Sequence, residues 1–297
     1  MMNNQIFWIS SYPKSGNTLL RSILVSLFFT DDGKFELDKL KKIRQFENTS
    51  LVKKNKHLFD NNYLKLGNTA LFYEYIEKLQ SKKSIGLEQD FMFLKTHSGL
   101  FTIGGNPFTS EKNTRGIIYI LRDPRDVCVS YSKHTGLTIN EAVKFMTNDY
   151  AFAHWVESPS GESLFNDQNR PRSFYSSWEK HVLSWTSIKW KSPIMILKFE
   201  DLIINKEVII NEIINFFEKN YNFKFANKDE KIQNILASTN FLKLKKEEAQ
   251  KGFEESTKHN SFFSVGKKNQ WKSILNNEQT EKIEQKFSKV MKNFNYT

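Results

Sequence analysis

The chain has 297 residues and a net charge of +11, from 44 Lys and Arg against 33 Asp and Glu. This length suffices for one large α/β domain, and no Pro-, Gly- or Ser-rich linker divides it, so we expect a single domain over residues 1–297. Its 26 Phe, 10 Tyr and 6 Trp residues can fill a bulky core, which excludes disorder of the whole chain. The charge indicates an anionic partner, which nucleic acid, acidic lipid and a charged nucleotide would all satisfy.

The cysteine content and the apolar segments bear on location. A single cysteine, Cys128, excludes an intramolecular disulfide and Cys-rich zinc sites, and it suits a reducing, cytoplasmic environment. The apolar stretch nearest the start, residues 6–9, is too short for the core of a signal peptide. No segment approaches the apolar length of a membrane span, so the sequence predicts a soluble protein.

Four short apolar runs lack the alternation of half-exposed strands and predict buried parallel strands, at residues 6–9, 91–94, 117–121 and 194–197. A helix with an apolar stripe follows the first run. After the third run, Asp123 can cap a helix that starts at Pro124. Strands that alternate with helices favour an α/β fold with a central parallel sheet flanked by helices, and with ligands beyond the carboxyl ends of the strands.

Other segments complete this outline. Residues 178–188 and 283–294 have apolar residues at helical spacing and should add to the core. The lysine runs at 39–42 and 53–56 are expected on a solvated surface. Polar, weakly periodic segments predict loops and short helices around the ligand edge, at residues 31–90, 102–115, 157–172 and 243–261.

A tight turn follows the first strand and opens the first helix. Residues 12–18 read Tyr-Pro-Lys-Ser-Gly-Asn-Thr, so consecutive backbone N–H groups and the positive helix end face one point. This arrangement predicts a P-loop-like cradle for a phosphate. It is not a Walker A loop, because Lys14 precedes Gly16 and no glycine stands five residues before Gly16. A P-loop kinase or NTPase is therefore disfavoured.

Residues 12–18 resemble the Tyr-Pro-Lys-Ser-Gly-Thr-Thr-Trp loop of the cytosolic sulfotransferase family, whose donor is 3′-phosphoadenosine 5′-phosphosulfate (PAPS). The resemblance implies that the loop holds the 5′-phosphosulfate and that Lys14 contacts the oxygen bridging phosphate and sulfate. Leu19 stands where the family has a tryptophan that stacks on adenine. The 5′-phosphate would be bound by Ser15, Gly16, Asn17 and Thr18.

Residues 121–131 read Leu-Arg-Asp-Pro-Arg-Asp-Val-Cys-Val-Ser-Tyr and resemble a second motif of this family. The resemblance implies that Arg122 and Ser130 bind the 3′-phosphate of the donor. Both can reach one phosphate if the nucleotide lies along the start of the helix. Arg125 and Asp126 are interpreted as surface charge and helix cap.

Residues 93–97, Phe-Leu-Lys-Thr-His, resemble the strand end that carries the catalytic base of the family. Histidine suits this role because it is largely neutral near pH 7 and can take the proton of the acceptor. We expect His97 to act as this base, while Lys14, assisted by Lys95, stabilises the leaving phosphate without a metal ion. The acceptor is a hydroxyl or an amine, and phenols, alcohols, amines and glycans are all compatible.

Weaker matches extend the resemblance towards the C-terminus. Residues 177–185 are similar to a helix of the family that contains Ser-Trp and His-Val pairs. Phe199 stands where the family has a tyrosine that reaches adenine, which preserves the ring but removes the hydroxyl. Thr239 corresponds to a threonine near the base.

Residues 266–272 resemble the segment that closes over the 3′-phosphate in the family, but Ser264 and Val265 replace its Arg and Lys. Either the closing loop is weaker, or Lys267 and Lys268 supply the charge from the other side of Gly266. We favour the second interpretation, in which two hydrated point charges replace a bidentate fork. No dimerisation motif of the family is recognisable after these residues, so the oligomeric state is open.

Three alternatives stand beside a catalytic sulfotransferase. A kinase or NTPase would need a magnesium site and a Walker lysine. A basic nucleic-acid-binding protein would need base-stacking aromatic motifs or a reading helix, and the sequence has neither. A degenerate sulfotransferase, which binds the nucleotide without turnover, is suggested by Leu19, Ser264 and Val265.

Overall fold

The computed structural model describes residues 5–59, 69–153, 173–253, 255–256, 261–263 and 266–297. Its main sheet has four parallel strands in the order β2-β1-β5-β6. The strands are β1 (Ile6–Ser10), β2 (Met92–Thr96), β5 (Thr114–Leu121) and β6 (Ile194–Lys198). The four predicted strands and the α/β class are thus confirmed, but the edge strand β6 is only partly buried, with Ile196 40% exposed. A separate antiparallel pair consists of β3 (Thr102–Ile103) and β4 (Asn106–Pro107).

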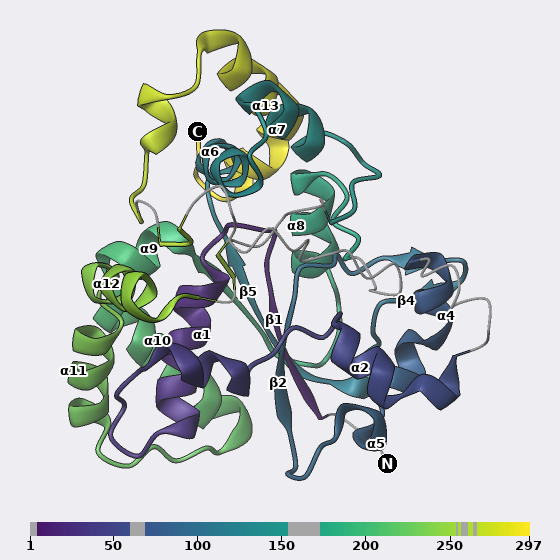
Figure 1. Cartoon of the computed structure of the whole chain (residues 1–297), viewed down its shortest axis with the longest axis vertical. Helices are drawn as coiled ribbons and strands as arrows, with labels where there is room; N and C mark the ends of the chain where they lie inside the picture. Colours follow the sequence, from purple (N-terminus) through teal and green to yellow (C-terminus); the bar gives the residue numbers. More distant parts are fainter. Residues whose placement is uncertain (1–4, 60–68, 154–172, 254, 257–260, 264–265) are drawn as a thin grey trace.

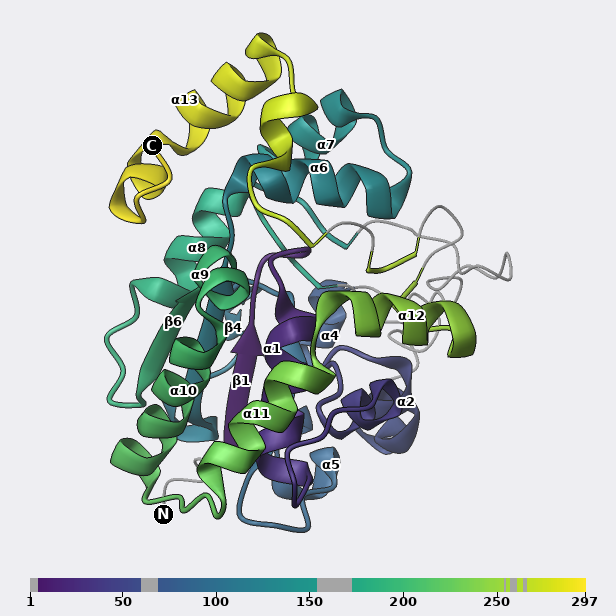
Figure 2. The same cartoon turned by 90° about the vertical axis from the view of Figure 1, so that its left-hand side faces the viewer.

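Helices cover both faces of the sheet and its carboxyl end (Figures 1 and 2). On one face lie α1 (Asn17–Phe29), α9 (Phe199–Ile204), α10 (Lys206–Tyr221), α11 (Lys228–Ser238) and α12 (Phe241–Lys251). On the other lie α2 (Thr49–Lys54), α4 (Thr69–Leu79), α5 (Lys82–Ile85) and α8 (Trp178–Thr186). Beyond the carboxyl end lie α6 (Pro124–Thr135), α7 (Ile139–Met146) and α13 (Asn277–Asn293). Short 3₁₀ helices span Leu37–Lys42, Lys56–Leu58, Glu111–Asn113 and Gln270–Ser273.

Strand β1 divides the core in two. Its side chains alternate between faces, so Ile6 and Trp8 pack in one apolar cluster while Phe7 and Ile9 pack in the other. All four are fully buried. A strand covered on both faces needs apolar residues at every position, which is why this run lacks the alternation of a half-exposed strand.

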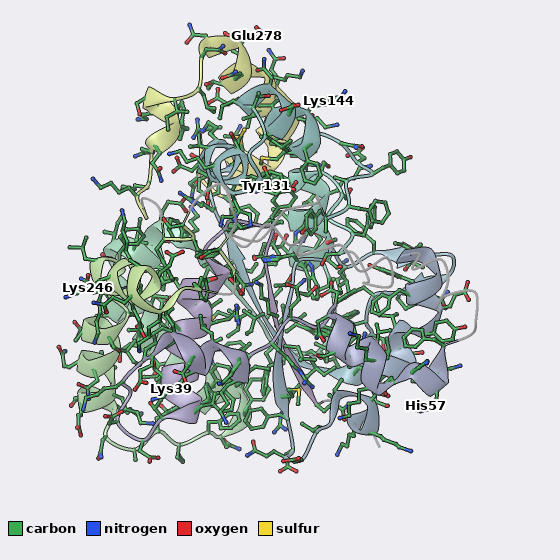
Figure 3. The ribbon with its side chains drawn as sticks, in the orientation of Figure 1. Lys39, His57, Tyr131, Lys144, Lys246 and Glu278 are labelled. Carbon is green, nitrogen blue, oxygen red and sulfur yellow. The ribbon has the colours of Figure 1, made fainter. Side chains whose placement is uncertain are left out.

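Some polar segments are more regular than the sequence suggested. Helices α4 and α12 each span 11 residues, longer than the loops and short helices predicted for residues 31–90 and 243–261. Residues 157–172, predicted as a loop, lie outside the described residues, as do Ser264 and Val265. The lysines of the runs 39–42 and 53–56 are exposed, as predicted, except for Lys39, which is half-buried and is labelled in Figure 3.

The interpretation of Arg125 and Asp126 as surface charge and cap was wrong. Their side chains are buried, and the cap of α6 is Asp123, which accepts a hydrogen bond from the backbone N–H of Arg125 at 2.9 Å. Asp126 accepts the backbone N–H groups of Asn269 and Trp271 at 2.7 and 3.0 Å. The Arg125 guanidinium lies 4.0 Å from the centre of the Trp271 ring. Both residues therefore fasten the C-terminal segment to α6.

We predict that Asp126→Asn lowers the free energy of unfolding by about 1 to 3 kcal/mol, because an amide offers one acceptor where the carboxylate offers two to the partly buried N–H groups of Asn269 and Trp271. Urea unfolding would measure the change. Asp90→Asn serves as the control, since Asp90 is exposed and its substitution should stay within about 0.5 kcal/mol. Equal, small effects of the two substitutions would contradict an anchoring role for Asp126.

Candidate functional site

Strand register brings the predicted site residues to one edge of the sheet. Lys95 pairs with Ile9 of β1, and the loop with Lys14 begins just after that strand. His97 follows β2 and Arg122 follows β5. A cavity of about 450 Å³ opens at this edge. The carboxyl ends of parallel strands thus meet there, as in other open α/β sheets.

Most of the predicted residues line this cavity, but three do not. The lining includes Lys14, Gly16, Asn17, Thr18, Leu19, Lys95, His97, Arg122, Ser130, Phe199, Thr239 and Gly266. Ser15 is buried outside the lining, whereas the side chains of Lys267 and Lys268 are exposed. The two lysines favoured as replacements for the family's closing charge therefore extend into solvent instead of into the cavity.

The loop before α1 has the backbone of an anion cradle. Lys14 has a φ of 66° and Gly16 a φ of 100°, and no side chain caps the start of α1. The N–H groups of its first turn are thus available to a ligand. An ideal Cβ at residue 16 would lie 2.4 Å from the Phe199 ring, so any larger residue would have to displace this ring.

Arg122 ties this loop to the C-terminal segment. Its Nη1 donates to the Lys14 carbonyl and its Nη2 to the Lys267 carbonyl, both at 3.1 Å, while the guanidinium lies 4.4 Å from the centre of the Phe199 ring. Among the described residues, the buried Nε of Arg122 and Oγ of Ser15 have no hydrogen-bond partner. The unused donor of Arg122, which lines the cationic cavity, fits a phosphate group.

The ring orientation of His97 can be assigned from its partners. Nδ1 lies 2.9 Å from the Ser11 carbonyl oxygen, which can only accept, so Nδ1 carries the proton. Nε2 is then left with a lone pair in a residue that lines the cavity. Desolvation, together with the nearby Lys95 charge, lowers the pKa of His97 well below its ordinary 6.5. The imidazole is therefore neutral at physiological pH, as a general base must be.

A second histidine, which the sequence did not single out, supports the first. His181 of α8 donates from Nε2 to the His97 carbonyl at 3.0 Å, and its Nδ1 accepts the Tyr119 hydroxyl at 2.9 Å. Burial lowers the pKa of His181 to about 3, so both hydrogen bonds keep their direction. The sequence indicated His181 only through its place in residues 177–185, which resemble a helix of the family. That resemblance does not predict which residues His181 contacts.

The two cavity lysines are desolvated. Burial lowers the pKa of Lys14 to about 7, with Glu255 acting in the opposite direction, and its Nζ lies 3.9 Å above the Phe262 ring. Burial also lowers the pKa of Lys95, again opposed by Glu255, whose Oε1 lies 3.0 Å from the Lys95 Nζ. Both ammonium groups thus lie where an anionic ligand would raise their pKa values.

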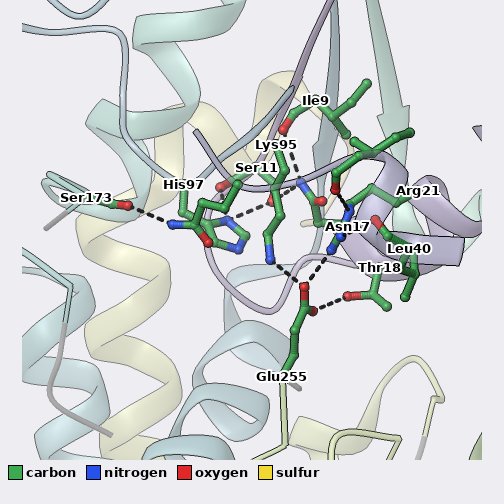
Figure 4. A network of polar contacts seen from close by, with 12 residues as sticks. Ile9, Ser11, Asn17, Thr18, Arg21, Leu40, Lys95, His97, Ser173 and Glu255 are labelled. Atoms are coloured by element: carbon green, nitrogen blue, oxygen red, sulfur yellow. Dashed lines mark hydrogen bonds and ion pairs between the residues drawn. The ribbon is translucent and has the colours of Figure 1, made fainter. Parts of the chain in front are cut away.

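Several polar residues at the cavity belong to no motif and were missed. Glu255 accepts the Thr18 hydroxyl at 2.8 Å and pairs with Arg21 at 2.5 Å, as Figure 4 shows. Lys206 donates to the Thr239 carbonyl at 2.9 Å, and Glu47 accepts the Thr96 hydroxyl at 2.7 Å. Only a fold that joins distant segments reveals such contacts, because the partners are up to 237 positions apart.

Cys128 is buried, and burial raises the pKa of its thiol to about 12. In the part of the chain that the structure describes, no three or more His, Cys, Asp or Glu residues are grouped so as to hold a metal ion. No helix within those same ranges has the length and apolar character needed to cross a membrane.

Comparisons with curated proteins find relatives over much of the chain. Sulfotransferase 1B1 of Canis lupus familiaris is 28% identical over 80% of this chain and 65% of its own length. Luciferin sulfotransferase of Photinus pyralis is 24% identical over 81% of this chain and 57% of its own length. The chain thus spans less than two thirds of the length of these two relatives. Cytosolic sulfotransferase 17 of Arabidopsis thaliana is 23% identical over 94% of this chain and 72% of its own length.

Solved structures share the fold, and a family model matches nearly the whole chain. Mouse sulfotransferase SULT7A1, complexed with PAP, superposes with a TM-score of 0.59 at 19% identity, covering 99% of this chain and 85% of its own. Retinol dehydratase in complex with androsterone and the inactive cofactor PAP gives a TM-score of 0.59 at 17% identity, covering 97% and 80%. The model for the sulfotransferase domain matches residues 4–295. The chain therefore belongs to the sulfotransferase domain family.

Proposed function

We propose that this protein is a PAPS-dependent sulfotransferase with one catalytic domain over residues 1–297. It moves a sulfuryl group to a hydroxyl or amine of a small-molecule or glycan acceptor and releases adenosine 3′,5′-bisphosphate (PAP). The observation that carries the proposal is one cavity in which a neutral histidine, His97, faces the cations Lys14, Lys95 and Arg122. A cytoplasmic location is proposed with it, since one relative is named a cytosolic sulfotransferase.

The base and the leaving-group cation lie on neighbouring strand ends. His97 takes the acceptor proton at Nε2, because Nδ1–H is held by the Ser11 carbonyl. Lys14 stabilises negative charge that develops on the bridging oxygen as the bond to sulfur breaks. The bound donor supplies the sulfuryl group, and a singly charged transferring group can be handled by lysines alone.

The nucleotide contacts are proposed from the cradle. Backbone N–H groups of residues 15–18 face the 5′-phosphate, and Arg122 with Ser130 takes the 3′-phosphate. The Lys267 and Lys268 side chains are exposed and do not reach the cavity. This segment contacts the site through the Lys267 carbonyl, which accepts a hydrogen bond from Arg122. Leu19, Phe199, Thr239 and Gly266 line the remaining wall, which is proposed for the adenosine.

The first prediction from the proposed function tests donor recognition. PAP should stabilise the protein by about 2.7 kcal/mol at a hundred times its dissociation constant. Arg122→Ala should weaken PAP binding by about 1.5 to 3 kcal/mol more than AMP binding, since AMP lacks the 3′-phosphate. Thermal shift and calorimetry measure both. A shift with Mg-ATP but none with PAP would favour a kinase, and equal losses for the two nucleotides would remove Arg122 from the 3′-phosphate site.

The second prediction concerns the base. His97→Ala should reduce transfer of labelled sulfate from PAPS to an acceptor pool by about 10² to 10⁴-fold, because proton transfer is lost. PAP affinity should be unchanged, since the ring binds no phosphate in this assignment. His57→Ala is the matched control, because His57 is exposed and remote from the cavity (Figure 3). Near-normal turnover by a stable His97 variant would exclude the base role.

The third prediction concerns pH. Lys14 must be protonated to act, and its pKa in the free protein is lowered to about 7, so kcat/KM should fall as pH rises through that region. The donor raises the pKa of Lys14, which should move the alkaline limb of kcat to higher pH than that of kcat/KM. The acid limb should lie below pH 6.5, because the pKa of His97 is lowered.

Lys14→Arg keeps a charge at every accessible pH and should move the alkaline limb of kcat/KM upward, whatever it does to the maximal rate. Rate profiles from pH 5 to 10 measure the shift. An alkaline limb that stays in place in Lys14→Arg would assign it to another group, with Lys95 as the next candidate because its pKa is also lowered.

A further inference from the structure

Glu255 lies among the cations of the cavity although no motif marks it. Its Oε1 contacts both the Lys95 Nζ, at 3.0 Å, and the Arg21 Nη1, at 2.5 Å. Its Oε2 accepts the Thr18 hydroxyl at 2.8 Å. Burial opposes ionisation, but the Lys95 and Arg21 charges hold the pKa of this carboxyl well below its usual range. Glu255 is thus a fixed anion in a site that must also admit an anionic donor.

The surroundings of Arg21 indicate that this carboxylate stays when a ligand enters. Arg21 is buried, and it donates from Nε to the Ile43 carbonyl at 2.9 Å and from Nη2 to the Leu40 carbonyl at 3.0 Å. Its remaining direction faces Glu255. Removal of Glu255 would leave a rigidly held, buried guanidinium without a counter-ion, which costs several kcal/mol in proteins.

The chain next to Glu255 is also fastened. Ser256 donates to the buried carboxylate of Glu248 on α12 at 2.5 Å, and the backbone N–H groups of Phe262 and Phe263 donate to the same carboxylate at 2.5 and 2.9 Å. Glu255 is therefore anchored to α1 through its side chain and to α12 through its neighbour. These two attachments should keep the Glu255 carboxylate in place when a ligand binds.

Lys95 is the group that this support acts upon. It comes from the end of β2, two residues before His97, and Figure 4 shows its side chain between His97 and Glu255. In the proposed reaction the sulfuryl group passes from the oxygen near Lys14 to the acceptor oxygen near His97. A cation beside that path contacts the transferring group itself, and it must be both charged and correctly placed.

We propose that Glu255 is a positioning residue that holds the Lys95 ammonium at the place of the sulfuryl group. The inference rests on the proposed function, because it assigns a role to Lys95 within it. Glu255 acts through Lys95 and touches no reacting atom. The ion pair restrains a long, flexible side chain, and it offsets the burial and the Arg21 charge that disfavour the ammonium form of Lys95.

The test compares PAPS with PAP in calorimetric titrations without acceptor. PAP lacks the sulfuryl group, so the ratio of the two dissociation constants reports contacts to that group. Glu255→Gln should weaken PAPS about tenfold while PAP changes by less than about twofold. In a Lys95→Met background the same substitution should leave the ratio unchanged, because the residue through which it acts is gone.

Glu278→Gln provides the matched control, since it removes the same charge from an exposed site at the far end of the molecule (Figure 3) and should leave both affinities unchanged. Equal weakening of PAPS and PAP by Glu255→Gln would overturn the inference, because Glu255 would then serve the fold. Tighter binding of both would also overturn it, since the carboxylate would be a competitor of the donor. An undiminished effect in Lys95→Met would do the same.

If Glu255→Gln melts too low for titration, Glu255→Asp takes its place. An aspartate is one methylene shorter and cannot contact Arg21 and Lys95 together, so the PAPS preference should fall severalfold, and an unchanged preference would overturn the inference. Absence of PAP binding to the wild-type protein would instead refute the proposed function. The two failures are therefore distinguishable.

Discussion

The site depends on the parallel register that pairs β1 with β2 and β5. In β2, Phe93 packs on the face that α1 covers, and Lys95, two residues later, must share that face. Lys95 thereby reaches Glu255, whereas Thr96 points to the other face and meets Glu47. A slip of one residue would exchange these directions and place the lysine in the other apolar core. Two buried sheet faces make such a slip very costly, so core packing also fixes the site.

The arrangement of buried parallel strands also explains why the local sequence predicted the residues at the strand ends. Short apolar runs predict the four strands, of which β1, β2 and β5 are largely buried while the edge strand β6 is half-exposed. Each run is followed by residues that cannot be buried without partners. Lys14, His97 and Arg122 stand at those ends, and they meet because carboxyl ends of parallel strands share an edge. The fold class and the principal cavity residues therefore follow from local patterns and family resemblance.

The residues that hold the cavity side chains in place could not be predicted from local sequence patterns. Glu255 meets Thr18 and Arg21 across more than 230 positions, and His181 reaches His97 across 84. Such contacts arise from tertiary packing between helices and strand ends, and no local spacing encodes them. Asp126 illustrates the converse error. Its place in the first turn of a helix indicates a solvated charge, but packing of the C-terminal segment buries it.

Desolvation acts in the same direction on His97 and Lys14, the proposed base and the proposed cation at the leaving oxygen. Exclusion of water lowers the pKa values of both His97 and Lys14. This favours the neutral imidazole that a base needs, but it disfavours the charged ammonium form of the lysine. Glu255 and Glu248 oppose this effect on Lys14, but Glu255 pairs with Lys95 and Arg21 instead of Lys14.

Full protonation of Lys14 near neutral pH therefore depends on a bound anionic ligand. An anionic donor in the cradle should raise the pKa of Lys14 most strongly, because Lys14 lies in the loop that faces the phosphate and its Nζ packs on the Phe262 ring. His97, farther along the neighbouring strand end, is held neutral by burial and by the nearby Lys95 charge. In the proposed reaction, donor binding then completes the arrangement: a protonated lysine at the leaving oxygen and an unprotonated histidine at the acceptor.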